Sequence, residues 1–351
     1  MDYIILDTNI FFKENFLEGK RIQEFLKLSK EGHIRIVLTQ IIIDEVKNNY
    51  KKQLNKAIEH FGIFKNARES RTFRNNSIGN QLFVKPKKSD LIQEFNDEFD
   101  SIIKQSKVII INYTTLDIGV VFKKYFQNEF PFNKSDKKGE FPDAFSFELI
   151  QKWVNNKNNN CTILSTDKDF LNLNGLNPQI KILKDYESFL DHKLKEALLK
   201  NSRINILDKL FLSSSEKIDK EISKWVYDQL YDESFFHSFI YVEIHDIQEP
   251  KIYIDAKEYQ IVSINDDTIE IEIKIEVSYE VTINVDDEES MYYDSDDKMY
   301  YYYNKANRNI EGTTVIEAIY SAIIVNEDDY EDELELDGIL NNEIDHDYGE
   351  Y

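Results

Sequence analysis

Four acidic residues occupy positions where the sequence predicts strand ends or the beginnings of helices. Asp7 follows the apolar run YIIL, and Asp167 follows the apolar run CTILS. Glu45 lies in the helix predicted after Thr39, and Asp143 lies in the first turn of a later helix. In an open parallel α/β sheet, sites form at the carboxyl ends of the strands, so the four carboxylates are expected to meet in one crevice.

Carboxylates that converge in this way repel each other unless a hard divalent cation neutralises them. The set therefore predicts one or two bound Mg²⁺ or Mn²⁺ ions, with Asp169 as an additional candidate ligand. Zinc is disfavoured, because the chain has one cysteine and its six histidines show no HExxH spacing. The chemistry that suits such a site is hydrolysis of a phosphodiester by metal-activated water.

Three of the four acids also have a simpler interpretation. Asp7 could cap the helix that follows it, Asp143 could favour a helix N-terminus, and Asp167 could form an Asx-turn. We favour the joint interpretation because all four occur in the order and on the elements that one site requires. Asp44 competes with Glu45, since neighbouring helical residues point about 100° apart.

Strands alternate with helices over residues 1–198, which favours a parallel sheet with helices on both faces. The expected strands are short apolar runs at 3–6, 34–38, 108–112, 161–165 and 181–183. Residues 199–326 differ, because 268–284 alternates apolar and polar residues as a half-buried antiparallel strand does. The sequence thus predicts an α/β domain followed by an acidic α+β domain with an antiparallel sheet, and 327–351 is predicted to be a mobile acidic tail.

The charge is distributed unevenly along the chain. Residues 1–200 hold 32 Lys and Arg against 27 Asp and Glu, whereas residues 201–351 hold 11 against 39. The whole-chain net charge of −23 is therefore the wrong number for judging partners. The first half remains compatible with a nucleic-acid substrate.

Residues 47–88 contain eleven basic residues against two glutamates, which predicts a track for phosphates. Nearby phenylalanines could stack on unpaired bases, although we prefer to interpret them as core residues of a helix with a solvated face. The residues expected to bind substrate are Lys47, Lys51, Arg68, Arg71, Arg74, Lys137 and Lys138.

Four fragments resemble the PIN-domain nucleases over roughly residues 1–190. They are ILDTNIF at 5–11, TQIIIDEV at 39–46, EFPDAFSFELI at 140–150 and ILSTDKDF at 163–170. The resemblance implies a metal-dependent endoribonuclease in which the four acids hold Mg²⁺ or Mn²⁺. Asn9 and Thr166 would orient these acids or a water molecule.

The sequence departs from compact PIN domains, because Glu45 and Asp143 are 98 positions apart, with much of 65–110 inserted. Two alternatives remain open, a structure-specific DNA nuclease and a catalytically inactive RNA-binding scaffold. The family also includes bacterial toxins, so a toxin or phage-defence role is compatible with the resemblance.

The acidic second half could mimic nucleic acid and restrain the nuclease, or it could serve as an adaptor or self-association domain, which we favour. A single cysteine and the lack of a signal peptide or a membrane-spanning run in the sequence lead us to expect a cytoplasmic protein.

Overall fold

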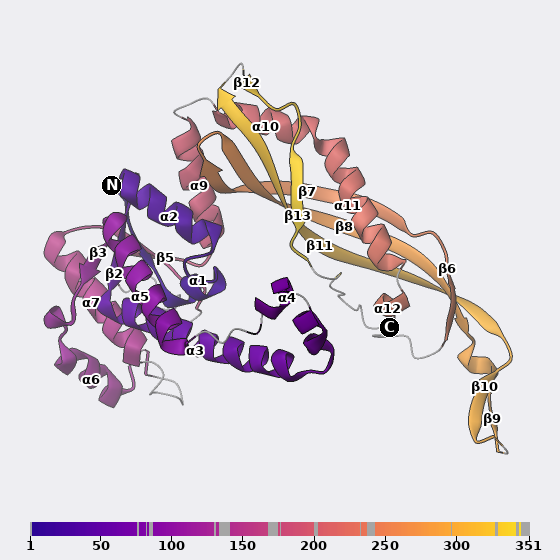
Figure 1. The fold of residues 1–351 in the computed structure, drawn as a ribbon. Coiled ribbons are helices and arrows are strands. Elements are labelled where there is room, and N and C mark those ends of the chain that lie inside the picture. Colours follow the sequence, from indigo (N-terminus) through magenta and orange to yellow (C-terminus); the bar gives the residue numbers. More distant parts are fainter. Residues whose placement is uncertain are drawn as a thin grey trace. The chain divides into compact units, whose positions relative to one another are not determined.

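The computed structural model divides the chain into two compact units, Met1–Leu190 and Asp191–Tyr351 (Figure 1). The boundary falls inside α9 (Tyr186–Leu199). The structure describes residues 2–75, 77–81, 83, 87–129, 131–132, 141–167, 175, 177–199, 203–231, 233–236, 243–295, 297–326, 329–341 and 344.

The first unit is built on a five-stranded parallel sheet in the order β3-β2-β1-β4-β5. Its strands are β1 (Asp2–Leu6), β2 (Ile34–Thr39), β3 (Ile109–Ile111), β4 (Cys161–Leu164) and β5 (Ile180–Leu183). The central strands consist mainly of buried aliphatic residues, as expected for strands covered on both faces. The predicted α/β class is confirmed.

Helices connect these strands, and their ends follow ordinary capping rules. Thr39 caps α3, because its hydroxyl accepts a hydrogen bond from the Ile42 amide, and Gly32 ends α2 with φ +90°. The helices are α1 (Thr8–Lys13), α2 (Lys20–Glu31), α3 (Gln40–Asn66), α4 (Ser77–Gln81), α5 (Lys88–Gln105), α6 (Ile118–Gln127) and α7 (Phe141–Lys157). The 3₁₀ turns are η1 (Glu69–Asn75) and η2 (Tyr113–Thr115).

The strand order reverses between β1 and β4, which are adjacent in the sheet although about 160 positions separate them in the sequence. β1 leads outward to β2 and β3, whereas β4 leads to β5 on the other side. Open α/β sheets bind ligands at such a switch point, beyond the carboxyl ends of the strands. The residues that directly follow β1 and β4 therefore occupy the position where a site is expected.

The second unit contains a strongly elongated antiparallel sheet, which confirms the predicted class. Its strands are β6 (Ile244–Ile247), β7 (Lys251–Asn265), β8 (Thr268–Asp286), β11 (Lys305–Asn326), β12 (Asp329–Tyr330) and β13 (Glu335–Ile339). A hairpin of β9 (Met291–Asp294) and β10 (Met299–Tyr302) connects β8 to β11. The helices of this unit, besides the end of α9, are α10 (Arg203–Ser213), α11 (Ser215–Leu230) and α12 (Glu233–Phe236).

The alternation of residues along β8 has the predicted effect, since its isoleucines and valines are buried and its polar residues are mostly half-buried, with Glu272 as a buried exception. Gly312 in β11 lies opposite Tyr279 in β8, and a Cβ at this position would overlap the tyrosine ring.

Part of the segment expected to be a mobile acidic tail is in strands. β12 and β13 both pair with β11, and Leu334 between them is fully buried. The acidic composition does not prevent pairing here, because the acids of β13 lie on an edge strand where they remain half or fully exposed.

Candidate active site

Asp7 directly follows β1 and is the N-cap of α1. Its side chain is 6% exposed and accepts two hydrogen bonds, from the Thr8 amide at 2.7 Å and from the Ser165 hydroxyl at 2.6 Å. Burial raises the pKa of Asp7 to about 6, the two hydrogen bonds oppose this increase, and the nearby charge of Asp167 adds to it. Asp7 thus caps α1, as the simpler interpretation predicts, and it also lies at the end of β1, where the site interpretation expects it.

Ser165 directly follows β4 and is the residue that joins the two central strand ends. Its fully buried hydroxyl donates to Asp7 and accepts hydrogen bonds from the Asn9 side chain at 3.2 Å and the Asp167 amide at 3.1 Å. These three bonds use the one proton and two lone pairs of a hydroxyl. Sequence reasoning missed Ser165, although a small polar residue at the end of an apolar strand in ILSTDKDF was an available signal.

The structure places Asn9 and Thr166 beside this serine. Asn9 Nδ2 donates to Ser165, and Asn9 Oδ1 accepts from the Thr166 amide at 3.4 Å. Asn9 is thus linked to Asp7 through Ser165.

Glu45 lies on α3 and is connected to Asp7 through Thr8. The Thr8 hydroxyl donates to Glu45 Oε2 at 3.0 Å, while the amide of the same residue donates to Asp7. Burial raises the pKa of Glu45, the Thr8 hydrogen bond lowers it, the charge of Asp7 raises it and Lys52 lowers it. Thr8 is a second residue that sequence reasoning missed.

Asp44 and Glu45 differ in the residues that they contact. Asp44 is exposed and accepts hydrogen bonds from Gln40 at 2.9 Å and from the Tyr113 hydroxyl. Glu45 is the one of the two that interacts with Thr8 and Asp7.

Asp143 lies in the first turn of α7, and the neighbouring turn anchors this helix to the sheet. One turn further along α7, the buried Ser146 hydroxyl lies 2.8 Å from the Thr39 hydroxyl at the carboxyl end of β2. Residues three apart share a helix face, so Asp143 is half-buried on the side of α7 that carries Ser146. Pro142 and Glu45 line one cavity.

Within the described part of the chain, no three Asp, Glu, His or Cys side chains form a group that could by itself hold a metal ion. Asp169, Lys137 and Lys138 lie outside the described residues. The residues present nevertheless fit a hard divalent cation, because Asp7, Glu45 and Asp167 offer only oxygen ligands. Their negative charges also repel each other: the charge of Asp167 raises the pKa of Asp7, and the charge of Asp7 raises the pKa of Glu45. A bound cation would relieve this repulsion.

The predicted basic track follows α3 and η1. Lys51 is exposed on α3, as are Arg68, Arg71 and Arg74 beyond its C-terminal end. Lys47 differs, since its ammonium lies 2.6 Å from Asp100 in an ion pair.

The interpretation of the nearby phenylalanines as core residues is wrong for two of them. Phe64 is 40% exposed and Phe73 is 44% exposed, with ring centroids 6.1 Å apart, and the Arg74 guanidinium lies 4.4 Å from the centre of the Phe83 ring. Only the first turns of α3 pack against the sheet, so its distal half leaves these rings without a core to enter.

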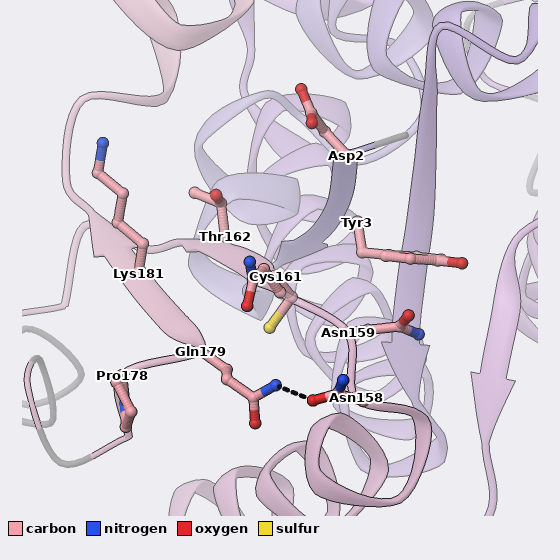
Figure 2. A pocket seen from close by; sticks show the side chains of 10 residues that line it. Asp2, Tyr3, Asn158, Asn159, Cys161, Thr162, Pro178, Gln179 and Lys181 are labelled. Carbon is pink, nitrogen blue, oxygen red and sulfur yellow. Dashed lines mark hydrogen bonds between the residues drawn. The ribbon is translucent and has the colours of Figure 1, made fainter.

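A cavity of about 480 Å³ lies at the amino ends of the strands, opposite the carboxyl ends that carry Asp7 and Ser165 (Figure 2). It is lined by residues at the beginnings of β1, β4 and β5, including Asp2, Cys161 and Lys181, and Gln179 donates a hydrogen bond to Asn158 across it. Because Asp7 follows the other end of β1, this cavity is not part of the candidate active site.

The profile of the PIN domain family matches residues 4–170, which contain the four acids, Ser165 and Asn9. No curated protein and no solved structure gives a significant match to the chain. The first unit is thus a PIN domain, as the sequence predicts, and the match does not extend to the second unit. PIN domains are generally metal-dependent nucleases, so a nucleic acid is the implied substrate.

Among the helices of the described residues, none is long and apolar enough to cross a membrane.

Proposed function

We propose that the chain is a metal-dependent endoribonuclease that hydrolyses phosphodiester bonds of RNA. The observation that carries the proposal is the buried Asp7 at the switch point of the sheet, with Glu45 and Asp167 within electrostatic reach. A buried carboxylate whose pKa is raised to about 6 by burial is costly to a fold. Such a cost is typical of a functional site.

Asp7, Glu45, Asp143 and Asp167 would hold Mg²⁺ or Mn²⁺, and Asp169 is an additional candidate. When bound, the metal supplies an activated water and stabilises the leaving oxygen. The protein's own contribution is orientation: Thr8 and Ser165 hold Asp7 and Glu45 through three hydrogen bonds of 2.6–3.0 Å. Asn9 donates to Ser165, and the Thr166 amide in turn donates to Asn9.

The exposed surface at the distal end of α3 supports a single-stranded substrate. This surface combines the cations Arg68 and Arg71 with the exposed rings of Phe64 and Phe73. Basic groups bind the backbone of a single strand and aromatic rings stack on its unpaired bases, which RNA offers in loops and ends. Lys47 and Lys51 on the same helix, Arg74 in η1, and Lys137 and Lys138 before α7 would extend the contact.

Cleavage of labelled single-stranded RNA and DNA of matched sequence, in Mn²⁺ or in EDTA, tests the proposal. We expect Mn²⁺-dependent internal cutting of RNA that Asp7→Asn and Asp143→Asn each lower by at least about 100-fold, since each removes a ligand charge. Asp97→Asn is the matched control, because Asp97 is exposed on α5 and bonds only to Gln93 in the described contacts.

Each alternative has its own outcome in this experiment. Preferential cutting of DNA would show that the chain is a DNA nuclease and not a ribonuclease. Binding of RNA without cutting in any divalent metal, unchanged by Asp7→Asn, would identify a scaffold instead of an enzyme.

We assign to the second unit a role in targeting or self-association. The β9–β10 hairpin supports this role, because it exposes Tyr293, Tyr300 and Tyr303 by 52%, 60% and 72% in an acidic part of the chain. Sedimentation of the full chain at several concentrations, compared with a Tyr300→Ser and Tyr303→Ser double variant, would distinguish self-association from binding to another protein.

A cytoplasmic location and a toxin or defence role complete the proposal. The one cysteine, Cys161, is buried and free, which suits a reducing compartment. Induced expression in a bacterial host should arrest growth and degrade RNA, and Asp7→Asn should abolish both effects; continued growth on expression of an active enzyme would remove the toxin role.

A further inference from the structure

A second cavity lies directly beside Glu45, on the side of α3 that faces the first turns of α7. Its volume is about 560 Å³, within the range of small-ligand sites. It is lined by side chains from α3, from the segment around η2 and from the first turns of α7: Ile41, Asp44, Glu45, Asn48, Tyr113, Leu116, Phe141, Pro142 and Phe145.

The walls and the rim of this cavity differ in chemistry. Its walls are aliphatic and aromatic, with Tyr113 46% exposed and Phe141 and Phe145 half-buried at a ring separation of 5.5 Å. Phe141 itself packs against Phe132 at 4.8 Å, so the aromatic wall is supported from behind. A supported wall of this kind keeps its shape for a flat ligand.

The rim provides hydrogen-bonding groups on the α3 side. Asp44 accepts from Gln40 and Tyr113, and a carboxylate has further acceptor capacity beyond these two bonds. Asn48 is exposed one turn further along the helix and can both donate and accept. A planar ring with N–H donors and acceptors on one edge matches this arrangement.

We propose that this cavity binds one unpaired nucleobase of the substrate, adjacent to the phosphodiester that is cut. The proposal rests on the proposed nuclease function, because Glu45 belongs both to the cavity lining and to the candidate metal site. A base seated between Tyr113 and Phe145 places its own backbone next to Glu45. Base stacking on aromatic side chains is how proteins recognise splayed-out RNA bases.

The cavity therefore gives the enzyme a way to select single-stranded positions. A base in a duplex is stacked and paired, so only an unpaired or flipped base can enter. The exposed surface at the distal end of α3 would contribute affinity along the strand, whereas the cavity would fix which bond is presented to the acids.

Fluorescence of a ten-nucleotide RNA that carries one 2-aminopurine tests the assignment. The full chain with Asp7→Asn, in EDTA, serves as the parent and prevents cutting. We expect quenching of the probe on binding, and Phe145→Leu or Tyr113→Leu should weaken binding at least about fivefold, since aromatic stacking is lost while apolar volume remains.

Phe126→Leu is the matched control. Phe126 is 74% exposed on α6 and is outside the cavity lining, so the same substitution should leave binding unchanged. Thermal unfolding of each variant confirms that it is folded. Unchanged binding in both cavity variants, or equal loss in Phe126→Leu, would overturn the proposal.

Cleavage by the chain that retains Asp7 provides a second readout. In an RNA with one abasic position moved along the strand, wild type should lose kcat/KM at one position, and Phe145→Leu should no longer distinguish that substrate from the intact one. Cutting that ignores the abasic position would refute the cavity and leave the nuclease function intact. If quenching depends on the cavity residues but the wild-type chain never cuts RNA, the cavity assignment stands and the nuclease function is refuted.

Discussion

At the scale of single residues, the candidate site depends on two neutral hydroxyls as much as on its acids. Thr8 contacts Asp7 through its amide and Glu45 through its hydroxyl, and Ser165 connects Asp7 to Asp167 and Asn9. Such bonds stabilise the charged form of a carboxylate, so they oppose the increase in pKa that burial causes. Both hydroxyls keep the acids available for a cation near neutral pH.

Ser165→Ala should shift the acidic limb of the pH–rate profile to higher pH by about one to two units. A hydrogen bond to a charged group is worth roughly 1.5–3 kcal/mol, and 1.36 kcal/mol corresponds to one pKa unit. Since the Ser165 bond lowers the pKa of Asp7, its loss raises this pKa, and the ionised form is then populated only at higher pH.

The measurement is kcat/KM in Mn²⁺ between pH 5 and 8, together with the apparent Mn²⁺ affinity at pH 6.5. Ser101→Ala is the control, because Ser101 is exposed on α5 and contacts only Gln105 in the described bonds. A uniform loss of rate at all pH values would show that Ser165 acts on packing and not on the ionisation of Asp7.

The sequence predicts where the candidate acids lie in the sheet, but it does not predict the hydrogen bonds that the Ser165 and Thr8 hydroxyls make to them. Asp7 and Asp167 stand at the ends of apolar runs, where an α/β sheet puts its sites. Ser165 and Thr8 are ordinary small polar residues, and their roles depend on bonds across 158 and 37 positions of the sequence. Such bonds appear only when the strand order is known.

At the scale of elements, the order of the strands positions the candidate site. Alternating strands and helices predict a parallel sheet, yet they do not determine that β4 pairs with β1. The pairing Leu6↔Leu164 makes Asp7 and Ser165 neighbours, and the Asp7 amide donates to the Leu164 carbonyl at 3.1 Å. The alternation along β8 was sufficient to predict a half-buried strand, whereas the pairing of β13 with β11 was hidden by its acidic composition.

Thr39→Ala should lower the free energy of unfolding of the first unit by roughly 1–3 kcal/mol. The threonine hydroxyl caps α3 and contacts Ser146 on α7, so its removal leaves the helix end uncapped and a buried serine without this partner. Thr39→Ser retains the hydroxyl and should retain most of the stability.

Urea unfolding can be followed in the first unit alone. The chain has two tryptophans, Trp153 in α7 and Trp225 in α11, so a Trp225→Phe background leaves Trp153 to report on the PIN domain. Equal destabilisation by alanine and serine would assign the effect to the methyl group of Thr39.

At the scale of the whole molecule, the chain joins a weakly basic half to a strongly acidic one. If RNA is the substrate, as we propose, long-range repulsion by the acidic half should weaken its binding at low salt and be screened as salt rises, whereas contacts with the basic residues on and beyond α3 should weaken with salt. The expected salt dependence is therefore the difference between two opposing effects.

Arg68→Gln combined with Arg71→Gln should reduce the slope of log affinity against log salt by about 1.4, since each single-strand phosphate contact contributes about 0.7. Both arginines are exposed near Phe64 and Phe73. Lys157→Gln, at the exposed end of α7, removes a positive charge elsewhere and should leave the slope unchanged. Binding measured by fluorescence anisotropy between 50 and 300 mM salt would decide, and an unchanged slope in the double variant would exclude the α3 surface as a phosphate track.

The pairing of β8 with β11 has a consequence for the order in which the second unit folds. The β9–β10 hairpin closes a short turn, and the pair Asp286↔Lys305 follows directly behind it, continuing to Thr268↔Ile323. Each new pair therefore closes only a small additional loop, which costs little chain entropy. We expect the β8–β11 pair to form by zippering from the tyrosine-rich hairpin toward Thr268, so the hairpin that we propose for a partner contact is also where this strand pair begins to form.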